Sequence, residues 1–288
     1  MKEALYYEKL PEKGVRCTLC PHNCLIGPGK RGLCKSRINE GGILYSEVYG
    51  HPCAVAIDPI EKKPLRQFHP GSQCLSLACT GCNFHCLNCQ NFEISQVKPS
   101  QTEAYELNPE DVVALAERKG LDIIAYTYTE PLTYLEYVAD TAKAAHAKGM
   151  KNVLVTAGYI NVQPLADLLP WLDAANVDLK SFSDDIYRKV SGGSLKPVLN
   201  TILKMKEAGV WVELTHLLIP TVNDKPEMFR DMCRWIVGHG MADTPLHISR
   251  FFPLYKMSNL YPTPLKTMKE AELIAHTTGI KNVYLGNI

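Results

Sequence analysis

Short apolar runs alternate with amphipathic segments along most of the chain after residue 73. The runs rich in Val, Ile, Leu and Tyr predict β-strands at 74–79, 122–128, 152–157, 176–180, 210–218, 246–252 and 282–286. Segments with a helical pattern lie between them at 109–120, 135–149, 196–209 and 225–240, and several end in Gly, a common helix stop. This alternation of strand and helix predicts βαβ units and a parallel sheet.

The repeated units predict an α/β fold. Six or more of them favour a partial (β/α)6 TIM-like barrel over residues 73–288, with its site at the carboxyl ends of the strands. A doubly wound open sheet is the alternative. Residues 1–72 are rich in Cys, Gly and Pro, with a short strand-like piece at 43–50, and form an N-terminal cysteine-rich segment in this interpretation.

Composition and charge narrow the classes of partner. The chain has 288 residues, of which 46% are hydrophobic, and a net charge of +1. This composition is typical of a globular protein. The small net charge creates no strong electrostatic attraction to nucleic acid or a membrane, so neither partner is expected. No apolar run reaches the roughly 18 residues of a membrane helix, and the charged start lacks the apolar core of a signal peptide. A cytoplasmic location is therefore expected.

Eleven cysteines require an explanation in that compartment. Disulfides rarely persist in the cytosol, so clustered cysteines there are more often metal ligands or redox groups. All but Cys233 lie between Cys17 and Cys89. Cys233 falls in a helical apolar pattern, which predicts a small buried hydrophobic residue.

The densest group of thiols is the stretch "CTGCNFHCLNCQ" at 79–90, directly after the first predicted barrel strand. Cys82, Cys86 and Cys89 form a C-x3-C-x2-C set, and cysteine thiolates are the usual ligands of iron–sulfur clusters. Three ligands on a four-iron cluster leave one metal position open, which is typical of catalytic sites. On spacing alone, a structural zinc site that also uses Cys79 stays open as the alternative.

This motif after the first strand of a partial barrel resembles that of the radical S-adenosylmethionine (SAM) superfamily. The wider stretch "CTGCNFHCLNCQNFEISQ" resembles the branch that contains the pyruvate formate-lyase activating enzymes. The segments "YTYTEPLTYLEY", "VDLKSFSDDIY", "VWVELTHLLIPTVND" and "PLHISRFFPLYKM" resemble the AmmeMemoRadiSam-system radical SAM enzymes more closely. The resemblance extends from about Cys17 to the last residue.

The resemblance implies a reaction and its cofactors. SAM would chelate the open iron of a [4Fe-4S] cluster held by Cys82, Cys86 and Cys89. One electron would then break a sulfonium carbon–sulfur bond, giving methionine and a 5′-deoxyadenosyl radical that abstracts hydrogen. Such an oxidoreductase takes its electron from a donor such as flavodoxin or ferredoxin. The sequence does not indicate whether the substrate is a protein or a small molecule.

The resemblance also assigns residues to SAM. Glu130 stands where the family binds the SAM amino group, and charge-assisted hydrogen bonds between ammonium and carboxylate are strong ones. The other assigned residues are Thr129, Thr156, Gly158, Asp178, Lys180 and His247. Without the resemblance, Glu130 could be a helix N-terminal charge, Asp178 and Lys180 a surface ion pair, and His247 a hydrogen-bonded core residue.

The N-terminal segment carries a second group of thiols. Cys17, Cys20, Cys24 and Cys34 have the spacing C-x2-C-x3-C-x9-C, which predicts a second metal site, either zinc or another cluster. The alternative is a reduced, thiol-rich loop packed on the barrel mouth, and Cys53 or Cys74 could join either site. For the whole protein, the alternative to an enzyme is a metal-stabilised binding module with structural zinc–cysteine sites and no SAM turnover.

Overall fold

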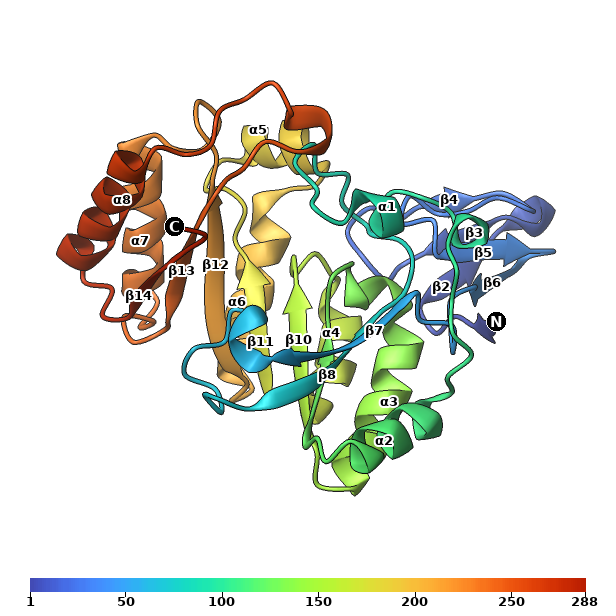
Figure 1. Cartoon of the computed structure of the whole chain (residues 1–288). Coiled ribbons are helices and arrows are strands. Elements are labelled where there is room, and N and C mark those ends of the chain that lie inside the picture. The colour runs from blue at the N-terminus through green and yellow to red at the C-terminus, as the bar shows by residue number, and fades with distance from the viewer.

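The computed structural model describes residues 1–288 and contains one eight-stranded main sheet (Figure 1). Its first strand, β7 (Ala54–Pro59), is antiparallel to β8 (Gln73–Ala78). The following strands are all parallel and lie in chain order: β9 (Ile123–Tyr126), β10 (Lys151–Thr156), β11 (Ala174–Asp178), β12 (Trp211–Leu218), β13 (Leu246–Arg250) and β14 (Val283–Gly286).

This strand order confirms the partial barrel. A doubly wound sheet reverses its strand order at a switch point, whereas this sheet never does. β7 and β14 are the two edges and do not pair with each other, so the barrel stays open. The strands are buried on both faces, as in β9, where all four residues are buried.

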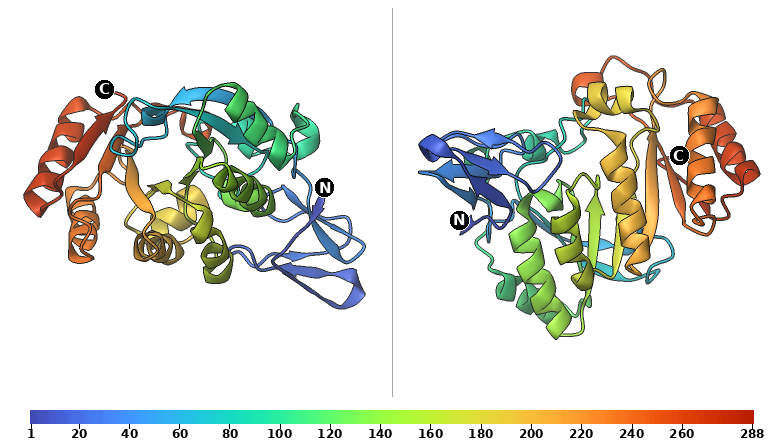
Figure 2. Two further views of the ribbon diagram at one scale, coloured as in Figure 1. Left: turned by 90° about the horizontal axis from the view of Figure 1, so that it is seen from below. Right: turned by 180° about the vertical axis from the view of Figure 1, so that it is seen from behind.

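Helices connect the parallel strands and lie on the outer side of the curved sheet (Figure 2). The α-helices are α1 (Phe92–Ser95), α2 (Pro109–Arg118), α3 (Leu135–Ala147), α4 (Val162–Leu168), α5 (Asp184–Ile186), α6 (Leu195–Glu207), α7 (Pro226–Gly238) and α8 (Leu265–Thr278). The 3-10 helices are η1 (Pro11–Lys13), η2 (Ile60–Lys62), η3 (Pro99–Gln101), η4 (Pro131–Tyr134), η5 (Leu169–Trp171) and η7 (Tyr255–Met257), and η6 (Tyr187–Ser191) is a π-helix. None of the helices is long and apolar enough to cross a membrane.

The predicted strands and helices are all present, with ends that differ by a few residues. Cys233 lies on α7 with its side chain fully buried in the main core, which confirms its prediction as a small hydrophobic residue. The sequence pattern does not predict β7, α4 or α8.

The N-terminal segment forms two small antiparallel sheets beside the barrel (Figure 1). One contains β1 (Lys2–Glu3), β6 (Ile43–Ser46) and β5 (Arg37–Glu40), and the other contains β2 (Tyr7–Lys9), β3 (Val15–Cys17) and β4 (Leu25–Ile26). We call residues 1–53 the head. β7 falls within residues 1–72 but pairs with β8 of the main sheet, so the barrel sheet begins before residue 72. The domain boundary after residue 72 stays a prediction.

Candidate active site

The carboxyl ends of the barrel strands surround one cavity of about 810 Å³. This volume lies within the range of small-molecule and cofactor sites. Cys82, Cys86 and Cys89 line it together with all of the predicted SAM residues except Gly158, namely Thr129, Glu130, Thr156, Asp178, Lys180 and His247. Residues that are up to 165 positions apart in the sequence therefore face one space. Most of them follow or end a parallel strand, whereas His247 is the second residue of β13.

Three thiols of the cysteine loop face this cavity, and the fourth does not. Cys79 is fully buried outside the cavity lining, and its Sγ lies 3.6 Å from the carbonyl oxygen of Val48. The geometry thus fits a group held at three corners, as a [4Fe-4S] cluster with one free iron requires, and it does not fit the four-thiol alternative.

The cysteine loop is held in place by its backbone. The amide of His85 donates to Ser191 at 2.8 Å, and the amide of Leu87 donates to Val190 at 2.9 Å, so the loop is bonded to the π-helix η6. π-helical turns are rare and occur frequently at functional sites. Burial raises the pKa of the Cys82 and Cys86 thiols. Bound iron would reverse this, since a coordinating thiol is deprotonated by the charge of the metal.

Glu130 presents a preorganised carboxylate to the cavity. Its side chain is 2% exposed and accepts hydrogen bonds from the Leu132 amide at 3.1 Å, the Thr156 hydroxyl at 2.6 Å and the Ala157 amide at 2.8 Å. Burial raises the pKa of Glu130, and these hydrogen bonds oppose the rise. The bond to Leu132 also makes Glu130 the N-cap of η4. Glu130 is therefore a charge at a helix N-terminus, and it also lines the cavity.

The segment before Glu130 is strained. Tyr128 has φ of 64°, a left-handed conformation that is rare for an aromatic residue and is common at ligand sites. Its hydroxyl donates to Asp58, and the Lys63 ammonium lies 4.3 Å from its ring centroid. The Thr129 hydroxyl is engaged with the Cys79 carbonyl at 2.6 Å. Thr129 therefore has its hydroxyl committed to the fold, although the residue lines the cavity.

Asp178 and Lys180 form an ion pair at the end of β11, with 2.9 Å between Oδ2 and Nζ. Burial alone would lower the pKa of Lys180, but the Asp178 carboxylate and the neighbouring Cys86 raise it overall. The lysine therefore stays charged within the cavity. The two residues thus form the ion pair that the sequence offered as the alternative, and they also line the cavity, while their contact with SAM stays a prediction.

His247 is fixed by a carboxylate that the sequence does not single out as a site residue. Its Nε2 lies 2.6 Å from Glu213, which is fully buried on β12 and also accepts from the backbone amides of Arg66 and Gln67. His247 is therefore both hydrogen-bonded in the core and part of the cavity lining. The one sign of Glu213 in the sequence is an acidic residue inside an apolar strand.

Gly158 acts through its backbone rather than as a lining residue. Its φ is +68°, its amide donates to the Thr156 hydroxyl at 2.9 Å, and a Cβ there would lie 3.1 Å from Val177 Cγ1. It thus turns the chain behind Glu130 and Thr156.

We expect Gly158→Ala to lower the free energy of unfolding by about 2–4 kcal/mol, because it adds crowding to left-handed strain. Gly209→Ala is the matched control, since Gly209 has φ of +79° but open space around its Cβ. It should cost only the strain, about 1–2 kcal/mol. Urea unfolding measures both, and equal losses would show that the space behind the loop is not constrained.

The fold and the site together define a class of protein, an open (β/α) barrel with three thiols on the loop after its first parallel strand. The model of the Radical SAM superfamily matches residues 77–236, more than half of the chain. The chain belongs to this superfamily, and membership implies a [4Fe-4S] cluster and SAM as cofactors.

Individual proteins are similar to this chain to different extents. An uncharacterized protein of Methanocaldococcus jannaschii is 46% identical over 288 residues, which is 100% of this chain and 86% of the relative. The pyruvate formate-lyase-activating enzyme of Clostridium pasteurianum is 23% identical over 163 residues, covering 54% of this chain and 66% of the enzyme. The crystal structure of QueE from Escherichia coli shares the fold, with a TM-score of 0.51 and 13% identity over 82% of this chain and 93% of QueE.

Proposed function

We propose that the protein cleaves SAM reductively to methionine and a 5′-deoxyadenosyl radical, which abstracts hydrogen from a substrate. The observation that carries the proposal is the convergence of three thiols and a buried, preorganised carboxylate on one cavity of about 810 Å³. The cluster, when bound, supplies the electron for the cleavage. The chain supplies Cys82, Cys86 and Cys89 as its ligands.

The remaining lining residues bind and orient SAM in this proposal. Glu130 accepts from the amino group, with Thr156 and Ala157 fixing its two oxygens. Asp178 and Lys180 lie on the ribose and carboxylate side, and His247 contacts SAM from β13. Thr129 contributes its backbone, because its hydroxyl is engaged elsewhere. A flavodoxin or ferredoxin in the cytoplasm provides the electron.

Within the superfamily, we assign the chain to the AmmeMemoRadiSam-system enzymes on its blocks "YTYTEPLTYLEY" and "PLHISRFFPLYKM". The similarity to a pyruvate formate-lyase-activating enzyme supports a related, activating-enzyme-like role on a protein, and modification of a metabolite is the second candidate.

SAM cleavage is tested directly on the whole chain. The protein is reconstituted anaerobically with iron and sulfide, reduced with dithionite and given SAM, and the products are separated by chromatography. We expect 5′-deoxyadenosine and methionine in equal amounts. A protein that binds zinc alone and forms neither product would instead be the metal-stabilised binding module.

Removing the Glu130 carboxylate is expected to weaken SAM binding. Glu130→Ala should cost about 1.5–3 kcal/mol, the value of a hydrogen bond to a charged group, or roughly 10- to 150-fold in Kd. Glu130→Gln is the matched control, because it keeps an acceptor for Thr156 but loses the charge, and its loss should be intermediate. Equilibrium binding to cluster-loaded protein of unchanged iron content measures the effect, and an unchanged Kd in Glu130→Ala would remove Glu130 from the SAM site.

A further inference from the structure

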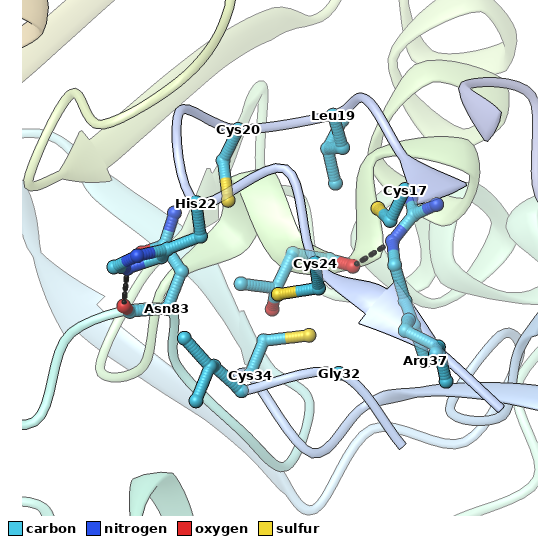
Figure 3. Close-up of a pocket in the computed structure, with 12 residues that line it drawn as sticks. Cys17, Leu19, Cys20, His22, Cys24, Gly32, Cys34, Arg37 and Asn83 are labelled. Carbon is cyan, nitrogen blue, oxygen red and sulfur yellow. Dashed lines mark hydrogen bonds between the residues drawn. The ribbon is translucent and has the colours of Figure 1, made fainter. Parts of the chain in front are cut away.

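The four cysteines of the head line a second, separate cavity of about 20 Å³ (Figure 3). Cys17 ends β3, Cys20 and Cys24 lie on the following turn, and Cys34 precedes β5. All four thiols are free, and Cys17, Cys20 and Cys34 are buried. The four cysteines therefore line one common space in the head.

The space between the thiols distinguishes a single ion from a cluster. A four-thiolate zinc site is a closed tetrahedron with Zn–S bonds of about 2.3 Å, which leaves no room for even a water molecule at its centre. The head cavity of about 20 Å³ exceeds the 10–15 Å³ that one water requires. In addition, no three of the His, Cys, Asp and Glu side chains converge closely enough to hold a single metal ion. The thiols therefore stand apart around a space instead of closing on one ion, and a four-iron core would move them further outward.

Arg37 provides an independent indication of an acceptor in this cavity. It lines the cavity and is 1% exposed. Its Nε donates to the Thr133 carbonyl at 3.0 Å and one terminal nitrogen donates to Glu136 at 2.8 Å, but the other terminal nitrogen has no partner. A buried cationic donor without an acceptor is costly. Four thiolates around an iron–sulfide core make an anionic group whose sulfurs accept hydrogen bonds.

We propose that Cys17, Cys20, Cys24 and Cys34 hold a second [4Fe-4S] cluster. All of its irons are bound by the protein, so it has no open position for SAM. Gly32 adjoins two of the ligands, since a Cβ there would lie 3.7 Å from the sulfur of Cys34 and 3.9 Å from that of Cys24. Alanine at this position would be in ordinary van der Waals contact with both sulfurs, and a longer side chain would crowd them.

The head cavity touches the active-site loop through the backbone. The amide of Cys82 donates to the carbonyl of Cys34 at 3.2 Å, which joins a ligand of one cluster to a ligand of the other. Gly81 permits this approach, because a Cβ there would lie 2.4 Å from the same carbonyl oxygen. Asn83, the next residue of the loop, lines the head cavity, and its carbonyl lies 2.8 Å from His22 Nε2.

This contact makes the second cluster a relay for single electrons. A low-potential protein donor reduces the second cluster by one electron. The second cluster then passes this electron to the SAM-binding cluster and returns to its oxidised state. The relay role rests on the proposed function, whereas the presence of the cluster does not.

The test uses the full chain with Cys82, Cys86 and Cys89 all replaced by alanine. After anaerobic reconstitution, we expect about four iron and four sulfide ions per chain, against about eight of each in the unaltered protein. Its reduced form should give an electron paramagnetic resonance spectrum that does not change on adding SAM. The reciprocal Cys20→Ser, Cys24→Ser variant should also keep about four irons, with a spectrum that SAM does change. Cys53→Ser, outside both cavities, is the control and should keep all eight.

Other outcomes overturn the inference. One zinc per chain without sulfide in the triple variant would make the head a zinc site, and no metal there would make it a reduced loop. Mössbauer spectra of the unaltered protein count the clusters independently should a variant fail to fold. A second cluster without any 5′-deoxyadenosine would instead defeat the proposed function alone. For the relay, the Cys20→Ser, Cys24→Ser variant should form 5′-deoxyadenosine with dithionite but not with flavodoxin, and equal rates with both would exclude it.

Discussion

Cys86→Ala is expected to abolish formation of 5′-deoxyadenosine from SAM while the protein stays folded. Cys86 is buried at the cavity wall, and alanine fits its space, so the change removes a ligand with little effect on packing. With two thiols left, the cluster loses one of its three attachments to the chain. Iron should fall from about eight to about four ions per chain, the remainder being the head cluster. Iron analysis and product chromatography measure the two effects.

Cys79→Ala is the informative control for this experiment. Cys79 lies three residues before Cys82 and would be the fourth ligand of a closed zinc site, but its thiol faces Val48 instead of the cavity. The variant should therefore retain its iron and its product. If Cys79→Ala loses metal as fully as Cys86→Ala, the site has four ligands and the proposed chemistry lacks its open iron. Full product in Cys86→Ala would contradict the ligand assignment.

The barrel was predictable because its strands are buried on both faces. Such strands appear as continuous apolar runs, and the helices between them have a contrasting period. The missed elements lack this contrast. α8 buries mainly Met268, Ala271 and Ala275, so its apolar face is narrow and made of small residues. α4 is only seven residues long and contains Pro164, and β7 ends at Pro59. Proline is unusual inside helices and strands, so these two segments do not show a clear helical or strand period.

The active-site residues were predictable to the extent that strand ends determine their place. Glu130, Asp178 and His247 belong to different units, and parallel pairing brings the units together. The supporting residues depend on tertiary register instead. Glu213 reaches His247 because β12 pairs with β13, with Thr215 opposite His247. The contact of Asp58 with Tyr128 likewise requires that β7 joins the sheet, which no local pattern indicates.

The docking of the head on the barrel depends on a buried ion pair that is also invisible in the sequence. Arg37 on β5 and Glu136 on α3 are 1% and 0% exposed in their side chains. The guanidinium donates to Glu136 at 2.8 Å, and the amide of Leu5 donates to the same carboxylate at 2.9 Å. Two segments of the head therefore meet one residue of the barrel.

Glu136→Ala is expected to lower the free energy of unfolding by about 3–5 kcal/mol, because it leaves a buried guanidinium without its counter-ion. The matched control is Glu117→Ala, which removes a carboxylate 44% exposed and 3.1 Å from Lys148. An exposed pair of this kind contributes at most about 1 kcal/mol. Denaturant unfolding of both variants measures the difference.

A double variant separates the buried charge from lost packing. In Glu136→Leu with Arg37→Met, both charges are replaced by apolar side chains of similar length, so most of the lost stability should return. If the double variant is as unstable as Glu136→Ala, the hydrogen bonds to Leu5 and Thr133 hold the head rather than the ion pair. If Glu136→Ala costs no more than Glu117→Ala, the head does not depend on this contact. Its other contacts with the barrel then hold it, such as the hydrogen bonds from Tyr49 to Asp140 and from the Cys82 amide to the Cys34 carbonyl.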